Sequence, residues 1–252
     1  MRQVLEIMYR GSDHSGWQIQ PNAPSIQEDL NKALSTILRQ DIYVVGAGRT
    51  DAGVHAHQMF AHFDFDGEFP GHFLQGLNGL LCDNIAVLAW YRPTIEDFHT
   101  RFTAISRAYV YTITRQKHPM LNEFSWWQKY DLDVDAMNAA ATAMLDYDEF
   151  GSFCKSKGGN ETNFCTMHHA YWEVHPDRLT FHVGANRFLR GMVRAIVGTL
   201  VQVGRGKMSV GEFRQVIESQ DRRKAGQAAP PEGLSLVEVG YPEGSLALIQ
   251  QG

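Results

Sequence analysis

Hydrophobic and polar residues follow two periods along the first part of this chain, and each period predicts a different element. A period of two or a short apolar run, typical of strands, marks residues 4–9, 54–65 and 85–91. A helical period of 3.6 begins after Ser25, where Ser25 and Glu28 form an S-x-x-E capping box, and again after Pro70. This part is therefore expected to run strand, helix, strand, helix, strand.

The second part of the chain repeats this alternation. Strand patterns occur at residues 107–114, 169–175, 178–184 and 233–241. Helical patterns occur at residues 134–145, in the apolar segment after Asn186, and after Ser209, which forms a second capping box with Glu212. Strands and helices mixed in both parts predict an α+β fold.

Composition limits the class of protein. The chain has 252 residues, of which 44% are hydrophobic, enough for one large domain or two modest ones. No apolar run reaches the length of a membrane span, and Cys82, Cys154 and Cys165 form no CxxC pair, which fits a reducing, cytoplasmic location. The formal net charge of −5 provides no overall attraction for nucleic acid, so a polyanion would need a local basic patch.

The segment GAGRTDAGVHAH, which begins at Gly46, combines glycines with charged residues. Gly46, Gly48 and Gly53 permit positive φ angles and close approach of a ligand. Arg49 can hold a phosphate or a neighbouring carboxylate. The pattern is typical of a loop that directs Asp51 into a cleft, and equally of a plain turn with a surface aspartate; the segment alone leaves both open.

Two other interpretations of this segment are disfavoured. A dinucleotide or phosphate loop needs a third glycine or Gly-Lys-Ser/Thr, whereas here Arg-Thr-Asp follows. A metal site would draw on the residues His55, His57, His62, Cys154, Cys165, His168 and His169. Their spacings match no zinc pattern, and strand histidines are more often packed or on the surface, so we expect no metal.

Five segments, in order, match the motifs of one enzyme family. They are YRGSDHSGWQIQ (9–20), GRTDAGVHA (48–56), FHTRFTAISRAYVYTI (98–113), NRFLRGMVRAIVGTLVQVGRGK (186–207) and AGQAAPPEGLSLVEVGY (225–241). Over nearly its whole length the chain resembles the TruA family of tRNA pseudouridine synthases. It departs from the family pattern at Arg10, where aspartate is usual, and at Thr100, where alanine is common.

The resemblance implies a fold and an activity. The fold would be two α/β subdomains with antiparallel sheets and a cleft between them, residues 1–105 with the aspartate loop and 106–252 with the tyrosine strand and arginine helix. The activity would be isomerisation of uridine to pseudouridine at nucleotides 38 to 40 of the tRNA anticodon stem-loop. The resemblance also implies a homodimer and no cofactor. Its catalytic residues would be Asp51, Tyr109 and Arg194, the last paired with the aspartate.

The chemistry of these residue types agrees with that assignment. Asp51 could add covalently to the base or the sugar, or abstract a sugar proton, and an arginine nearby would keep it ionised. Tyr109 shares a strand face with Tyr111; its ring could stack on uracil and its hydroxyl could relay the C5 proton, although ordinary sheet packing explains a strand tyrosine as well. Tyr111, which matches no family role, is expected to be packing.

Arginines form the expected RNA contact. Arg187, Arg190 and Arg194 lie three and four residues apart, which on a helix makes a ridge. Further cations follow at Arg205, Lys207 and residues 222–224, and together they predict a local phosphate-binding patch. Because the target uridine lies in or beside a stem, it must flip out, and Arg49 is a candidate to fill the vacated space or grip the backbone. The alternative is a non-catalytic RNA-binding module, for which Asp51 would be dispensable.

Overall fold

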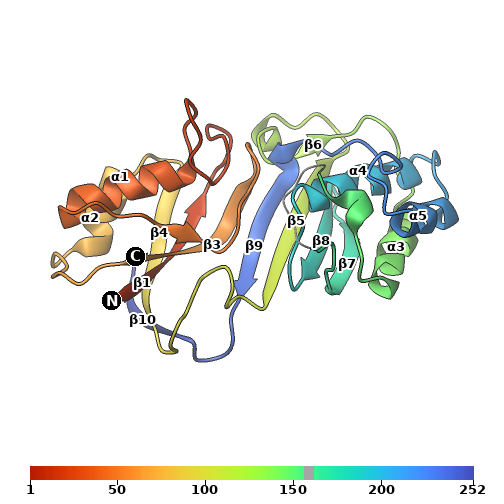
Figure 1. Ribbon diagram of the computed structural model, residues 1–252. Coiled ribbons are helices and arrows are strands. Elements are labelled where there is room, and N and C mark those ends of the chain that lie inside the picture. The colour runs from red at the N-terminus through yellow and green to blue at the C-terminus, as the bar shows by residue number, and fades with distance from the viewer. Residues whose placement is uncertain (156–161) are drawn as a thin grey trace. The chain divides into compact units, whose positions relative to one another are not determined.

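The computed structural model describes residues 1–155 and 162–252 (Figure 1). The chain folds into two compact units, the first made of Met1–Ile105 and Leu236–Gly252, the second of Ser106–Ser235. Both units combine mostly antiparallel strands with helices. The prediction of an α+β fold is confirmed.

The first unit has an antiparallel sheet beside two helices. Its elements are β1 (Arg2–Tyr9), α1 (Ile26–Leu38), β2 (Val45–Gly46), β3 (His55–Asp64), α2 (Phe73–Leu80), β4 (Ile85–Pro93), the greater part of β9 (Leu234–Gly240) and β10 (Leu246–Gln251). The strands run in the order β10, β4, β1, β3, and β2 also pairs with β3. Figure 1 shows α1 and α2 together at one side of this unit.

Sequence signals explain how α1 forms and packs. Ser25 takes the N-cap, and its hydroxyl accepts a hydrogen bond from the Glu28 N–H at 3.3 Å, which satisfies one otherwise free donor of the first turn. Ile26, Leu30 and Leu34 then fall on one face and are fully buried. Burying three such side chains contributes on the order of 5 kcal/mol to folding, and it fixes the helix against the sheet.

The described residues of the second unit form an antiparallel sheet of three strands, a short additional strand and three α-helices. Its elements are β5 (Ser106–Thr114), β6 (Trp126–Trp127), α3 (Val134–Ala143), β7 (Met167–Val174), β8 (Arg178–Ala185), α4 (Met192–Gly204), α5 (Val210–Glu218) and short 3₁₀ turns. The order is β5, β8, β7, with β6 parallel to β5. Helix α4 is buried along nearly its whole length, and α5 begins at the predicted capping box, with both reciprocal hydrogen bonds of Ser209 and Glu212 present.

The edge of the second unit's sheet is protected by a side chain. Asn138 of α3 donates from Nδ2 to the Trp172 carbonyl at 3.2 Å and accepts from the Trp172 N–H at 2.7 Å. Unpaired backbone groups on an edge strand invite another strand to pair, and this amide occupies them at the middle of β7.

The predicted elements are confirmed, with one correction. The helix expected after Asn186 begins only at Met192, preceded by Gly191 in the left-handed region at φ 70°. Arg187 and Arg190 therefore lie in the irregular segment before α4, and the prediction of a helical ridge that includes them is wrong. The short strands β2 and β6 and the terminal β10 were not predicted. Among the described residues, no helix is long and apolar enough to cross a membrane.

Candidate active site

Asp51 is presented by the loop between β2 and β3. Residues 9–20, here called the first motif, hold this loop. The Trp17 N–H donates to the Thr50 carbonyl at 3.2 Å, and the Gly53 N–H donates to the His14 carbonyl at 3.3 Å. The Thr50 hydroxyl lies 2.9 Å from that of Tyr9, in the interior. Residues on both sides of Asp51 are thus anchored, while Asp51 itself is half-buried.

The glycines of this region differ in whether their backbone conformation or their neighbours require a residue without a side chain. Gly53 has a positive φ of 78°, and Gly46 packs so closely on Trp17 that a Cβ would lie 2.5 Å from the indole ring. Gly48 has neither constraint, since its φ is ordinary and a Cβ would meet nothing within 4 Å. Of these three glycines, only Gly53 has the positive φ that glycine permits; Gly46 admits the Trp17 side chain, and the geometry of Gly48 does not require glycine.

The first motif contains its own close contact with the aspartate loop, which sequence reasoning missed. Gly16 has φ 94°, and a Cβ there would lie 2.4 Å from the Thr50 carbonyl oxygen and 3.0 Å from the Asp51 carbonyl carbon. The backbones of the two motifs touch, so Gly16 sets the position of the loop that carries Asp51.

The strand histidines of the first unit hold loops in place. His55 Nδ1 accepts from the Gly11 N–H at 3.1 Å. His62 Nδ1 lies 2.8 Å from the hydroxyl of the fully buried Thr100, which also donates to the Val45 carbonyl at 2.9 Å. The threonine that departs from the family pattern therefore ties the 98–103 segment to β2, directly before the aspartate loop.

A different group offers three metal-ligand types, although none of its members was a predicted ligand. Within the described residues, ligand atoms of His14, Asp29 and Cys82 all lie within 4.8 Å of one another. His14 Nε2 is 3.0 Å from an Asp29 oxygen, and the Cys82 thiol is 3.8 Å from the same oxygen. The three side chains thus form a hydrogen-bonded group in which the carboxylate is the shared partner.

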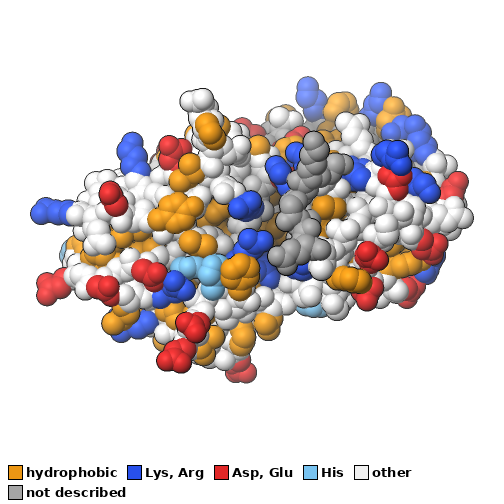
Figure 2. Space-filling view, viewed as in Figure 1, with side chains coloured by type: hydrophobic (Ala, Val, Ile, Leu, Met, Phe, Trp, Pro, Cys, Tyr) orange, Lys and Arg blue, Asp and Glu red, His pale blue; other side chains and the backbone are white. Residues whose placement is uncertain are grey.

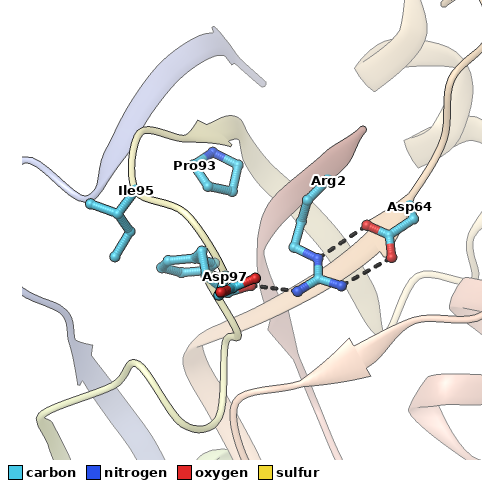
Figure 3. Close-up of a pocket in the computed structure, with 6 residues that line it drawn as sticks. Arg2, Asp64, Pro93, Ile95 and Asp97 are labelled. Carbon is cyan, nitrogen blue, oxygen red and sulfur yellow. Dashed lines mark hydrogen bonds and ion pairs between the residues drawn. The ribbon is translucent and has the colours of Figure 1, made fainter.

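A shallow pocket of about 210 Å³ lies elsewhere in the first unit (Figure 3). Arg2 points across it toward Asp64 and donates to both carboxylate oxygens at 3.0 Å, and its third nitrogen donates to the Phe98 carbonyl. No predicted site residue lines this pocket. The hydrogen bonds and the charge of the Arg2 guanidinium lower the pKa of Asp64.

The same guanidinium and burial make His62 a pH-dependent contributor to stability. Burial first, and then the charge of Arg2, lower the pKa of His62 from 6.5 to about 4. Between these values the unfolded chain binds a proton that the folded chain does not, so the free energy of unfolding falls as pH falls from 6.5 toward 4. We expect His62 to account for a loss of about 2 kcal/mol over this range.

Urea unfolding at several pH values measures this effect. His62→Asn puts a polar amide, which cannot ionise, in place of the imidazole. This variant should be less stable than wild type at pH 7 but should lose less stability on acidification. His57→Asn, at an exposed position of the same strand, is the matched control and should keep the wild-type slope. Equal slopes in all three proteins would contradict the role given to His62.

In the second unit, Tyr109 and Tyr111 lie on β5 in different environments. Tyr109 is half-buried, and its ring meets Phe188 edge-on at 5.1 Å. Tyr111 is fully buried and donates its hydroxyl to the Pro230 carbonyl at 2.8 Å, and burial raises its pKa far above the ordinary 10. Tyr111 is therefore a packing residue, as predicted, whereas the Tyr109 ring is only partly enclosed.

Arg194 is fixed in the first turn of α4 by the segment that precedes β9. Its Nε donates to the Ala229 carbonyl at 2.7 Å, and the Ala229 N–H donates to the Arg194 carbonyl at 2.8 Å. One turn later, a Cβ on Gly198 would lie 1.8 Å from the Gln227 carbonyl oxygen, so helix and segment meet backbone to backbone. This double contact restricts the directions that the guanidinium can take.

The other predicted RNA contacts belong to the second unit and have different surroundings there. Arg187 donates to the Thr162 hydroxyl at 3.3 Å, Arg190 is exposed, and the Arg205 guanidinium lies 4.0 Å above the Tyr130 ring. Figure 2 shows Lys and Arg side chains gathered over the end of this unit that carries α4 and α5. Arg49 and Asp51 belong to the first unit, whereas Tyr109, Arg194 and these arginines belong to the second.

Known proteins resemble this chain along nearly its whole length. The family model described as tRNA pseudouridine synthase matches residues 141–242. The tRNA pseudouridine synthase A of Bacteroides fragilis is 48% identical over 246 residues, which cover 96% of this chain and 97% of the relative. The tRNA pseudouridine synthase A of Parabacteroides distasonis is 45% identical over 245 residues, which cover 96% of this chain and 96% of the relative. That of Francisella tularensis subsp. novicida is 39% identical over 243 residues, which cover 95% of this chain and 94% of the relative. This chain therefore belongs to the tRNA pseudouridine synthase A family.

Proposed function

We propose that this chain isomerises uridine to pseudouridine in tRNA, at nucleotides 38 to 40 of the anticodon stem-loop. The observation that carries the proposal is the 48% identity, over nearly the full length of both chains, to a relative named tRNA pseudouridine synthase A. The Asp51 loop supports it, because backbone contacts from the first motif hold this loop on both sides of a half-buried carboxylate.

The reaction determines what the site must do. The N1–C1′ glycosidic bond breaks, the uracil turns, C5 bonds to C1′, and the proton on C5 leaves while N1 gains one, so no atom is lost and no oxidant is needed. We assign Asp51 to the first step, as a nucleophile toward the base or sugar or as a base that takes a sugar proton. In each case the carboxylate must be ionised and must face the flipped nucleotide.

The remaining residues receive supporting roles in this proposal. Arg194 pairs with Asp51 and favours its charged form, and the fixed backbone around Arg194 supports such a directed role. Tyr109 stacks on the detached uracil and relays the C5 proton. We assign phosphate contacts to Arg49, Arg187, Arg190 and Arg205, and we give Arg49 the further role of filling the space that the flipped base leaves or gripping the backbone.

Two properties follow from family resemblance rather than from the described contacts. We propose that the protein works as a homodimer, which sedimentation equilibrium would report as twice the chain mass of 28.4 kDa. A monomer at working concentration would refute it. Because its substrate is tRNA, we place its action in the cytoplasm.

The position of modification tests the substrate assignment. Three unmodified tRNAs, each with uridine at only one of nucleotides 38, 39 and 40, are incubated with the protein and digested to nucleosides. Pseudouridine should appear in each of them and be absent from a tRNA with cytidine at all three positions. Equal pseudouridine in that control tRNA would show that the enzyme acts at nucleotides other than 38 to 40.

A further inference from the structure

An exposed aromatic side chain lies in the 98–103 segment of the first unit. Phe102 is 74% exposed, whereas Phe98, four residues earlier, is buried. Single exposed apolar side chains are common on protein surfaces, so the meaning of this exposure depends on the groups that surround the Phe102 ring.

The segment that carries Phe102 is held tightly. The His99 N–H donates to the Thr103 hydroxyl at 2.9 Å, and the Thr103 N–H donates back to the His99 carbonyl at 2.8 Å. The Tyr241 hydroxyl donates to the carbonyl of the buried Thr100 at 2.7 Å. The backbone that carries the ring is therefore held, which reduces the conformational entropy lost when a ligand binds the ring.

Phe102 ends a row of rings that starts in the core. The buried His62 lies 4.7 Å from His99, and His99 lies 4.4 Å from Phe102, with an interplanar angle of 38°. Burial lowers the pKa of both histidines, so the row is uncharged at neutral pH. The Arg101 guanidinium lies 5.4 Å from the centre of the Phe102 ring and brings the positive charge.

An aromatic face beside a guanidinium suits one ligand class best. Any unpaired nucleobase can stack on an aromatic ring, and the phosphate of the same nucleotide can pair with the cation. The buried hydroxyl of Thr100, between His99 and Arg101, bonds the Val45 carbonyl at the start of the aspartate loop. The segment that carries Phe102 is thus bonded to β2, directly before the loop that presents Asp51.

We propose that Phe102, flanked by Arg101, is a stacking platform for an unpaired nucleobase of the RNA substrate outside the nucleotide that is isomerised. The inference rests on the proposed function and adds a second base-binding position to it. Phe102 positions the RNA and takes no part in the bond changes. Its loss should therefore weaken binding and leave the chemical step unaltered.

Steady-state tritium release from tRNA labelled at uridine C5 tests this position. Phe102→Leu, which keeps an apolar side chain but loses the ring, should raise KM about 10-fold with kcat unchanged, whereas Phe102→Trp should keep the wild-type KM. Tyr171→Leu is the matched control, since Tyr171 is also exposed and stacked on a histidine, at 4.9 Å. It should behave as wild type, and all variants should unfold at the wild-type temperature.

A double-mutant cycle identifies the stacked base. Single abasic nucleotides are placed in turn through the anticodon loop, and affinities are measured in an Asp51→Asn background, where no turnover occurs. At one position the losses of binding free energy caused by the abasic change and by Phe102→Leu should not add, because both remove the same stacking contact. If these losses add at every position, or if Phe102→Leu has an unchanged KM while the wild type is active, the stacking platform is overturned and the proposed function stands. A wild type that releases no tritium overturns the proposed function, and the platform with it.

Discussion

Asp51→Asn should abolish pseudouridine formation while leaving tRNA binding nearly intact. Asparagine has the size and shape of aspartate, so the loop held by Trp17, His14 and Tyr9 should be unchanged. It lacks the charged carboxylate oxygen that the first step of the proposed reaction needs, whether that oxygen acts as a nucleophile or as a base. We expect the single-turnover rate to fall at least about 10⁴-fold, equivalent to about 5.5 kcal/mol of transition-state stabilisation.

Binding and rate must be measured on the same preparation to interpret this variant. Its dissociation constant for unmodified tRNA should lie within about 3-fold of wild type, a change of less than about 1 kcal/mol. If Asp51→Asn retained the wild-type rate, the carboxylate would have no chemical role and the chain would be better described as an RNA-binding module. A loss of both rate and affinity would instead indicate that Asp51 holds the RNA.

Gly16→Ala should have the second largest effect, although Gly16 carries no functional group. Its φ of 94° is strained for alanine by about 1 to 3 kcal/mol. The new methyl would also lie 2.4 Å from the Thr50 carbonyl oxygen, a backbone atom that cannot move without moving Asp51. We expect a loss of at least about 2 kcal/mol of stability and, because a displacement near 1 Å misaligns reacting atoms, a rate about 100-fold lower.

Gly48→Ala is the matched control for this substitution. Gly48 lies in the motif of Asp51 itself, three residues away, but its Cβ would meet nothing within 4 Å and its φ is ordinary. Urea unfolding and single-turnover tritium release should both stay near wild type. If Gly48→Ala were as damaging as Gly16→Ala, the aspartate loop would depend on glycine content rather than on backbone contact with the first motif.

Local patterns in the sequence predicted most of the secondary structure for clear physical reasons. Ser25 and Ser209 mark the starts of α1 and α5, because a hydroxyl at the N-cap satisfies a free backbone donor. Alternation identified the central strands, since each has a buried face. It failed for β10, where LALIQQ has mostly exposed side chains. It also failed before α4, where an apolar stripe continues through Leu189 although Gly191 turns the chain.

Contacts between motifs could not be predicted, because they depend on tertiary structure. Nothing in the letters of SGWQ shows that the Gly16 backbone touches that of Thr50, or that Trp17 packs on Gly46. The exposure of Phe102 also could not be predicted, because Phe98 and Phe102 lie in the same motif. The structure alone shows that Phe98 is buried and that Phe102 is 74% exposed. The family motifs give the candidate site residues, and the structure shows which neighbouring residues hold the Asp51 loop in place.

The most direct test of the central claim is tritium release from unmodified tRNA labelled at uridine C5, with the wild-type protein in a metal chelator. Isomerisation leaves the mass of unlabelled tRNA unchanged but must free the hydrogen on C5. The account predicts one tritium released per modified uridine, from intact tRNA, and none with Asp51→Asn. Tight binding of tRNA by the wild type without any release of tritium would contradict it.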